Sequence, residues 1–98
     1  MHLIEVRRLV EVELADAAEW YSLQRAGFGD MFLEQFWKDS HIIAEAPQRW
    51  PMFIPGVRRY VMSRYPYLIY YKAEAQTVVI LRVVHGSSDP EAVKRGLY

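Results

Sequence analysis

The sequence predicts an α+β fold in the order β-α-α-β-β-β, with a helical hairpin packed on one face of an antiparallel sheet. Two patterns lead to this prediction. Apolar residues in the first half of the chain repeat at three- and four-residue steps, as in amphipathic helices, whereas the second half holds three runs of β-branched and aromatic residues. The length of 98 residues favours a single domain that spans residues 1–98.

The helical hairpin is predicted from its periodicity and its breaks. A first helix is expected from about residue 9 or 10 to about residue 25, and Gly27-Phe28-Gly29 ends it because glycine readily adopts the left-handed conformation of a helix stop. Asp30 is the expected N-cap of a second helix. Pro47 ends that helix, since proline disfavours the helical conformation in the residue before it. The short link makes the two helices antiparallel.

The sheet is predicted from three runs that follow a proline-rich segment. Residues 47–56 contain three prolines, which predicts a loop without regular structure. Compact links join the three runs, so they form an antiparallel meander. The expected strands are Val57–Ser63, Tyr67–Ala73 and Thr77–His85.

The two ends of the chain complete the predicted architecture. Residues 2–8 alternate loosely and predict an edge strand. Residues 78–81 are apolar on both faces, which is typical of an interior strand, so we expect the N-terminal strand to pair beside them. Residues 91–98 are either a short helix or a mobile tail.

Composition and charge exclude several classes of protein. The chain has no cysteine, which excludes disulfides and zinc–thiolate sites, and we expect no metal or cofactor. No apolar run has the length of a membrane helix or the form of a signal peptide, so a cytoplasmic protein is expected. Twelve basic and twelve acidic residues cancel, which argues against a freestanding nucleic-acid binder. Acids concentrate in residues 5–19 and arginines in residues 49–64.

Short motifs occur along nearly the whole chain in an order that is specific as a set, although each motif is weak by itself. They are Trp20-Tyr21, Gly27-Phe28-Gly29 with Phe32-Leu33, Pro47-Gln48-Arg49-Trp50-Pro51, Val57-Arg58-Arg59, Arg64-Tyr65-Pro66-Tyr67 with Tyr70-Tyr71, and Val79-Ile80-Leu81 followed by His85 and Asp89-Pro90. In this order the motifs resemble the RelE/ParE superfamily, the toxins of type II toxin–antitoxin systems that include the plasmid stabilisation proteins.

The resemblance implies partners as well as a fold. Such toxins are usually encoded beside an antitoxin protein that wraps around the toxin and neutralises it. Their targets differ between branches: RelE-like members cleave ribosome-bound messenger RNA, whereas ParE-like members act on DNA gyrase. A shared fold does not decide between these activities, so the residues of the site have to decide.

Arg64, Arg82 and His85 are the catalytic candidates if the protein is a nuclease. With the expected turns between the strands, Arg82 lies near Tyr67 and His85 projects past the same end of the sheet, close to Arg64. The arginines would stabilise the phosphate charge and His85 would transfer protons. Each residue also has a structural interpretation: Arg82 snorkels or pairs with a helix carboxylate, His85 caps a strand end, and Arg64 lies on the surface.

Arg58, Arg59, Tyr67 and Tyr71 are the candidate partner- or target-binding residues. Strand alternation sends the side chains of Arg58 and Arg59 to opposite faces, so only one of them can share a face with a given partner. The tyrosines either stack on bases or belong to the core and to contacts with a protein partner. The three tryptophans of the chain are interpreted as core or helix–sheet packing.

One departure from the family pattern favours the ParE-like branch. RelE-like nucleases have basic residues after the last strand, where this chain has Gly86-Ser87-Ser88. The middle strands also lack lysines at the matching positions, apart from Lys72. The leading interpretation is therefore a ParE-like toxin that inhibits growth by binding a cellular target, with gyrase implied, and that an antitoxin neutralises. The alternatives are a RelE-like ribosome-dependent mRNA endonuclease and a degenerate, non-toxic member that only binds an antitoxin.

Overall fold

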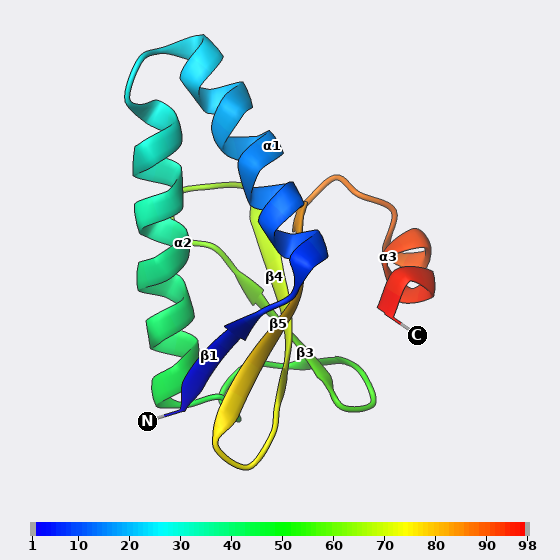
Figure 1. Ribbon diagram of the computed structural model, residues 1–98. Coiled ribbons are helices and arrows are strands. Elements are labelled where there is room, and N and C mark those ends of the chain that lie inside the picture. The colour runs from blue at the N-terminus through cyan, green and yellow to red at the C-terminus, as the bar shows by residue number, and fades with distance from the viewer. Residues whose placement is uncertain (1, 98) are drawn as a thin grey trace.

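A computed structural model describes residues 2–97 and shows a five-stranded sheet with helices on both faces (Figure 1). The elements are β1 (Leu3–Val6), α1 (Arg8–Gln24), α2 (Phe28–Glu45), β2 (Met52–Ile54), β3 (Val57–Val61), β4 (Tyr67–Ala73), β5 (Thr77–His85) and α3 (Pro90–Leu97). The strand order is β1-β5-β4-β3-β2. Helices α1 and α2 form an antiparallel hairpin on one face, whereas α3 packs on the opposite face. The predicted α+β fold and order of elements are confirmed.

The helical hairpin turns at Gly27, which has a left-handed φ of 88°. Both helices begin and end within about three residues of their predicted bounds. The N-cap of α2 is Gly27 and not the predicted Asp30, which lies in the first turn, where its negative charge favours the positive end of the helix dipole. Gly29 permits close contact between the helices, because a Cβ there would collide with Ser22 and with the backbone of Ala18.

The N-terminal strand lies beside β5, as predicted, but it runs parallel to β5. The sheet is therefore mixed, with antiparallel pairing from β5 through β2 and one parallel pair at the β1 edge. The apolar pattern of an interior strand is the same beside a parallel or an antiparallel neighbour, so the sequence did not distinguish the two directions. The interior position of β5 is confirmed, since both of its faces are buried.

The segment predicted as an irregular loop, residues 47–56, contains the edge strand β2, which corrects that expectation. Arg59 donates its backbone N–H to the carbonyl of Pro51 at 3.0 Å. Prolines flank β2 and do not interrupt its paired residues, and an edge strand tolerates them because one side of it needs no partner. Gly56, with φ 81°, follows Pro55 in the tight turn into β3. The prediction extended β3 two residues too far, to Ser63.

A β-bulge in β5 decides which of its residues face each side of the sheet. The register between β4 and β5 shifts between Tyr70 and Tyr71, which leaves Leu81 as an extra residue in β5. The extra residue changes the phase of the alternation, so Ile80 and Val83 both face the helical hairpin. Residues 82–85 of β5, which follow the bulge, therefore pair with β4 one residue away from where a regular hairpin would place them.

Two apolar cores lie on the two sides of the sheet. The larger core joins the hairpin to the sheet through fully buried residues such as Phe32, Phe36 and Ile69. The smaller one is closed by α3, whose Val93 packs against the outer face of β4 and β5. The C-terminal segment, predicted as either a helix or a mobile tail, is therefore a helix over Pro90–Leu97, and Tyr98 lies outside the described residues. No helix within residues 2–97 is long and apolar enough to cross a membrane.

A buried carboxylate anchors α2 to the sheet. Asp39 is fully buried, and its oxygens accept hydrogen bonds from the Tyr60 hydroxyl at 2.8 Å and from the backbone N–H of Ser63 at 2.9 Å. Gln35, one turn earlier in α2, donates a third at 3.2 Å. These donors make the burial of a carboxylate acceptable, because a buried polar group is costly only when it lacks partners. Asp39 therefore holds α2 against the end of β3.

Replacing Asp39 with alanine is expected to lower the free energy of unfolding by about 3 kcal/mol, because the Tyr60 hydroxyl and the Ser63 amide lose their buried acceptor. Urea unfolding followed by circular dichroism measures this change. Glu34→Ala, at an exposed acid on the same helix, is the matched control and should alter stability by less than about 0.5 kcal/mol. Equal stability of the two variants would contradict the anchoring role of Asp39.

Candidate functional site

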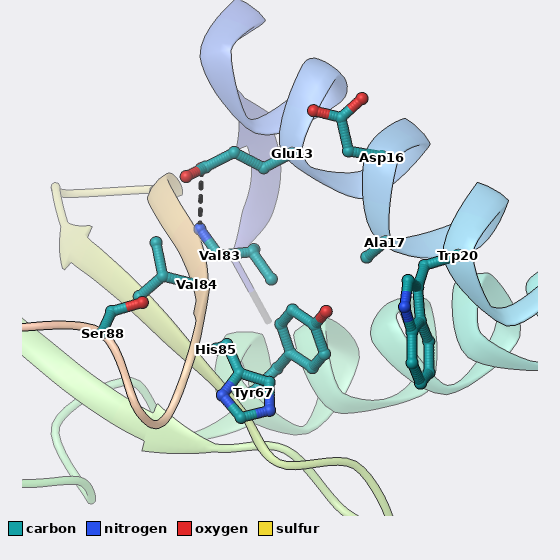
Figure 2. A pocket seen from close by; sticks show the side chains of 9 residues that line it. All are labelled: Glu13, Asp16, Ala17, Trp20, Tyr67, Val83, Val84, His85 and Ser88. Carbon is teal, nitrogen blue, oxygen red and sulfur yellow. Dashed lines mark hydrogen bonds between the residues drawn. The ribbon is translucent and has the colours of Figure 1, made fainter.

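Two adjoining clefts lie between α1 and the ends of β4 and β5, and they share Trp20, Tyr67 and His85 (Figure 2). Their volumes are about 390 Å³ and 270 Å³. We call the two together the α1–β5 cleft. The other lining residues are Glu13, Asp16, Ala17, Val83, Val84 and Ser88 in the larger part, and Tyr21 and Pro66 in the smaller part.

One face of α1 forms a wall of this cleft. Glu13, Asp16, Ala17 and Trp20 follow one another at helical spacing of i, i+3, i+4 and i+7, which places their side chains on one face. Ala17 is buried and small, so it leaves room between the larger side chains on either side of it. Asp16 and Trp20 are exposed at the rim.

Glu13 joins α1 to β5 through both of its carboxylate oxygens. One oxygen accepts the backbone N–H of Val83 at 3.0 Å, and the other lies 2.9 Å from Nε and 2.8 Å from Nη2 of Arg82. The amide is available because β1 ends at Val6, whereas β5 continues to His85 without a neighbour on that edge. The side chains of Glu13 and Arg82 are only 14% and 20% exposed, so the pair is largely shielded from water.

Aromatic side chains from both α1 and the sheet line the cleft. The Tyr67 and His85 rings meet edge to face with centroids 5.3 Å apart, and Trp20 meets Tyr21 in the same way at 5.0 Å. Burial raises the pKa of Tyr67 and of Tyr21 above the ordinary value of a tyrosine, so both phenols are neutral at physiological pH. Ser87 donates its backbone N–H to Nδ1 of His85 at 3.1 Å, which places the proton of a neutral ring on Nε2.

The three candidate nuclease residues do not come together in this cleft. His85 lines it and lies opposite Tyr67. Arg82 lies opposite Tyr70, and not near Tyr67 as predicted, because the turn is centred after Ala75 and the bulge shifts the register by one further residue. Its guanidinium is bound to Glu13, which confirms the structural interpretation of a strand arginine paired with a helix carboxylate. Arg64 is in the exposed turn between β3 and β4 and does not line the cleft.

The family of the chain follows from its matches to known proteins. The family model described as the ParE toxin of type II toxin–antitoxin system, parDE, matches residues 4–90. The chain belongs to the ParE toxin family. A solved chain from the chromosomal ParDE TA system of P. aeruginosa shares its fold with a TM-score of 0.72 at 16% identity, covering 87% of this chain and 96% of that one. No curated protein sequence matches.

Family membership confirms the resemblance of the ordered motifs to the RelE/ParE superfamily. The segment after β5 in this ParE-family toxin is a polar turn, in which Gly86 donates its N–H to the carbonyl of Pro66 at 2.7 Å and Ser88 donates to that of His85 at 2.9 Å. This turn places Ser88 at the cleft. Within residues 2–97, no three acidic or histidine side chains are grouped closely enough to hold a metal ion.

Arg64 has an unusual backbone conformation in this toxin. Its φ of 69° is in the left-handed region that non-glycine residues rarely adopt, and within residues 2–97 it is the one non-glycine residue there. The turn is held at its start by the bond from the Ser63 amide to Asp39 and is closed by the bond from the Met62 amide to the carbonyl of Tyr67. The anchored ends therefore hold Arg64 in a strained conformation with its side chain in solvent.

Of the four predicted binding residues, Arg59 and Tyr67 are accessible, whereas Arg58 and Tyr71 form hydrogen bonds within the fold. Arg58 donates to the carbonyl of Trp50 at 2.6 Å and to Gln48 at 2.8 Å, on the hairpin side of the sheet. Arg59 lies on the outer side, as the predicted alternation requires, with its guanidinium 5.2 Å from the Phe53 ring centroid. It is partly exposed.

The tyrosines divide in the same way. Tyr67 is partly exposed and lines the cleft. Tyr71 is fully buried and donates its hydroxyl hydrogen to the carbonyl of Pro47 at 2.7 Å. Burial raises the pKa of Tyr71 to about 12, against the opposite effect of Arg58. Tyr71 is therefore a core residue, and the expectation that it contacts a partner was wrong.

Glu13, Asp16 and Trp20 were missed as members of a site, although their spacing on one helix face could have indicated it. Trp20 was assigned to the core together with the other tryptophans, but its side chain is 55% exposed and that of Trp37 is 44% exposed. An amphipathic pattern predicts the buried face of a helix and does not show whether an aromatic residue at the border of that face is covered.

The coupling between Glu13 and Arg82 is expected to be about 2 kcal/mol in a double-mutant cycle of Glu13→Gln and Arg82→Met, measured by urea unfolding. The shielded pair and the shared Val83 amide make each single change strongly destabilising. The exposed pair Lys72–Glu74, at 2.9 Å, is the matched control and should couple by less than about 0.5 kcal/mol. Similar coupling energies for the two pairs would contradict the role of Glu13 in joining α1 to β5 through a shielded ion pair.

Replacing Arg64 with glycine is expected to stabilise the protein by about 1 kcal/mol relative to Arg64→Ala, because glycine adopts a positive φ without strain and alanine does not. Thermal unfolding monitored by circular dichroism compares the two variants. Alanine removes the same side chain but keeps the strain, so it isolates the backbone effect. A glycine variant no more stable than the alanine variant would show that the turn relaxes.

Proposed function

We propose that this protein is a cytoplasmic, growth-inhibiting toxin that acts by binding a protein target, DNA gyrase, and that a cognate antitoxin neutralises it. Membership of the ParE toxin family supports the toxin role. The similar P. aeruginosa structure is described as part of a ParDE toxin–antitoxin system, which supports an antitoxin as partner of this chain. The gyrase target follows from the resemblance to the ParE-like branch.

The composition of the cleft is the observation that favours binding over RNA cleavage. No lysine or arginine lines the cleft in the described part of the chain, whereas Glu13 and Asp16 do. RNA cleavage develops negative charge on a phosphate, and enzymes stabilise that charge with cations or N–H donors aimed at it. The Asp16 carboxylate, which has no counter-ion among residues 2–97, would instead repel the phosphate backbone.

The arginines of the chain support the same conclusion. Arg82, the strand arginine nearest to His85 in the sequence, already neutralises Glu13. Gly86-Ser87-Ser88 follow β5, where RelE-like nucleases have basic residues. Arg59 and Arg64 stay accessible, and we assign them together with Tyr67 to contacts with the target or the antitoxin.

Controlled expression in a bacterial host tests the proposal. We expect growth arrest, a DNA-damage response and intact messages by primer extension, together with inhibition of supercoiling when the purified chain is added to purified gyrase. Co-expression of the open reading frame that adjoins the gene should restore growth if that frame encodes the antitoxin.

His85→Ala separates this proposal from the nuclease alternative. His85 is exposed, so its replacement should leave the fold and the growth arrest unchanged. Cleavage of messages within codons by the unmodified chain, abolished by His85→Ala, would overturn the gyrase proposal in favour of a ribosome-dependent endonuclease. Unimpaired growth on expression of the unmodified chain would instead indicate the non-toxic, antitoxin-binding alternative.

A further inference from the structure

The α1–β5 cleft combines exposed aromatic rings with acidic side chains, and no lysine or arginine of residues 2–97 lines it. Its two parts share Trp20, Tyr67 and His85, so they form one continuous depression along α1. Figure 2 shows the Trp20 ring standing at one end and the carboxylates of Glu13 and Asp16 toward the other. This pairing of rings and carboxylates suits a cationic ligand better than an apolar or an anionic one.

The rings of the cleft have electron-rich faces at physiological pH. The pKa of Tyr67 is raised by burial, so this phenol stays neutral and keeps the quadrupole of an uncharged ring. Trp20, the ring type that binds cations best, is 55% exposed at the rim. The Trp20 ring meets the Tyr21 ring edge to face with centroids 5.0 Å apart, and Trp20 lines both parts of the cleft.

The acidic end of the cleft supplies an unused negative charge. Glu13 is neutralised by Arg82. Asp16 lies one turn before Trp20 on the same face of α1, and it forms no ion pair or hydrogen bond with the other residues of the range 2–97. Asp16 lines the larger part of the cleft and is exposed at its rim, so its carboxylate is accessible to a ligand that enters there.

We infer that the α1–β5 cleft binds an arginine side chain of a partner protein, with the guanidinium stacked on Trp20 and paired with the carboxylate of Asp16. Guanidinium is favoured over ammonium because it is planar, weakly hydrated and able to stack and to donate hydrogen bonds at the same time. Ser88 and Tyr67 line the same cleft and provide a hydroxyl group and an aromatic ring beside the aliphatic stem.

The partner is the antitoxin of the proposed function, and only that identity rests on the proposed function. The binding of an arginine side chain is a property of the cleft and is measurable on the purified chain alone. A bound arginine would lie on the helical hairpin side, beside the Glu13 contact that joins α1 to β5.

Titration of the ¹⁵N-labelled chain with the peptide acetyl-Gly-Arg-Gly-amide tests the inference. We expect saturable shifts of the Trp20 indole N–H and the His85 amide, with a dissociation constant on the order of millimolar. The matched peptide with citrulline in place of arginine has the same shape without the charge, and it should bind at least about fivefold more weakly.

Asp16→Asn should weaken binding of the arginine peptide about fivefold and leave the citrulline peptide unaffected, because only the charged pair is lost. Glu19→Gln, at an exposed acid of α1 outside the cleft, is the control and should not change either affinity. Both positions are exposed, so the variants are expected to fold normally.

Three results would overturn the inference: no saturable shift at Trp20, equal affinity for the arginine and citrulline peptides, or unchanged binding by Asp16→Asn. Tighter binding of acetyl-Gly-Glu-Gly-amide would assign an anionic occupant and also overturn it. These results would leave the toxin proposal intact, since growth arrest is measured separately. Conversely, a non-toxic chain that binds the arginine peptide through Asp16 would refute only the proposed function.

Discussion

The contact that organises this molecule is the carboxylate of Glu13 on the uncovered end of β5. β1 leaves the sheet after Val6, so the edge of β5 beyond it has a backbone amide without a strand partner. Glu13 accepts that amide at Val83 and neutralises Arg82 with the same group. An unpaired buried amide and an unpaired buried arginine would each be costly, and one side chain satisfies both. The contact also places α1 at the distance from β5 that leaves the cleft open.

Both helices of the hairpin are anchored by the same device. Glu13 of α1 accepts the amide of Val83 in β5, and Asp39 of α2 accepts the amide of Ser63 just after β3, each at a point where the backbone amide lacks a strand partner. Apolar packing is largely non-directional, so it holds the helices on the sheet without fixing how each is rotated. The two carboxylates supply direction, and on α1 the face that carries Glu13 also carries Trp20 at the rim of the cleft.

The anchoring of α1 also bears on what the toxin can do. Arg82 is paired with Glu13, so its charge is not available to stabilise a phosphate during RNA cleavage. The polar turn after β5, Gly86-Ser87-Ser88, contains no lysine or arginine that could replace it. What remains at the end of the sheet is an acidic, aromatic cleft next to the exposed and strained turn at Arg64. Such surfaces suit recognition of another protein, in which aromatic residues and arginines supply much of the binding energy.

The sequence by itself determined the family, the helical hairpin and the bounds of β4 and β5, because glycine, proline and apolar periodicity act over a few residues. Tertiary structure decided the direction of β1, the pairing of β2 and the bulge at Leu81, and with the bulge the neighbours of Arg82 and His85. It also decided that Tyr71 is buried, that Trp20 is exposed and that Glu13 reaches a strand some 70 residues away in the chain. Apolar periodicity shows which face of a helix or strand is apolar. These features depend instead on which residues from distant parts of the chain pack against that face, and periodicity does not contain that information.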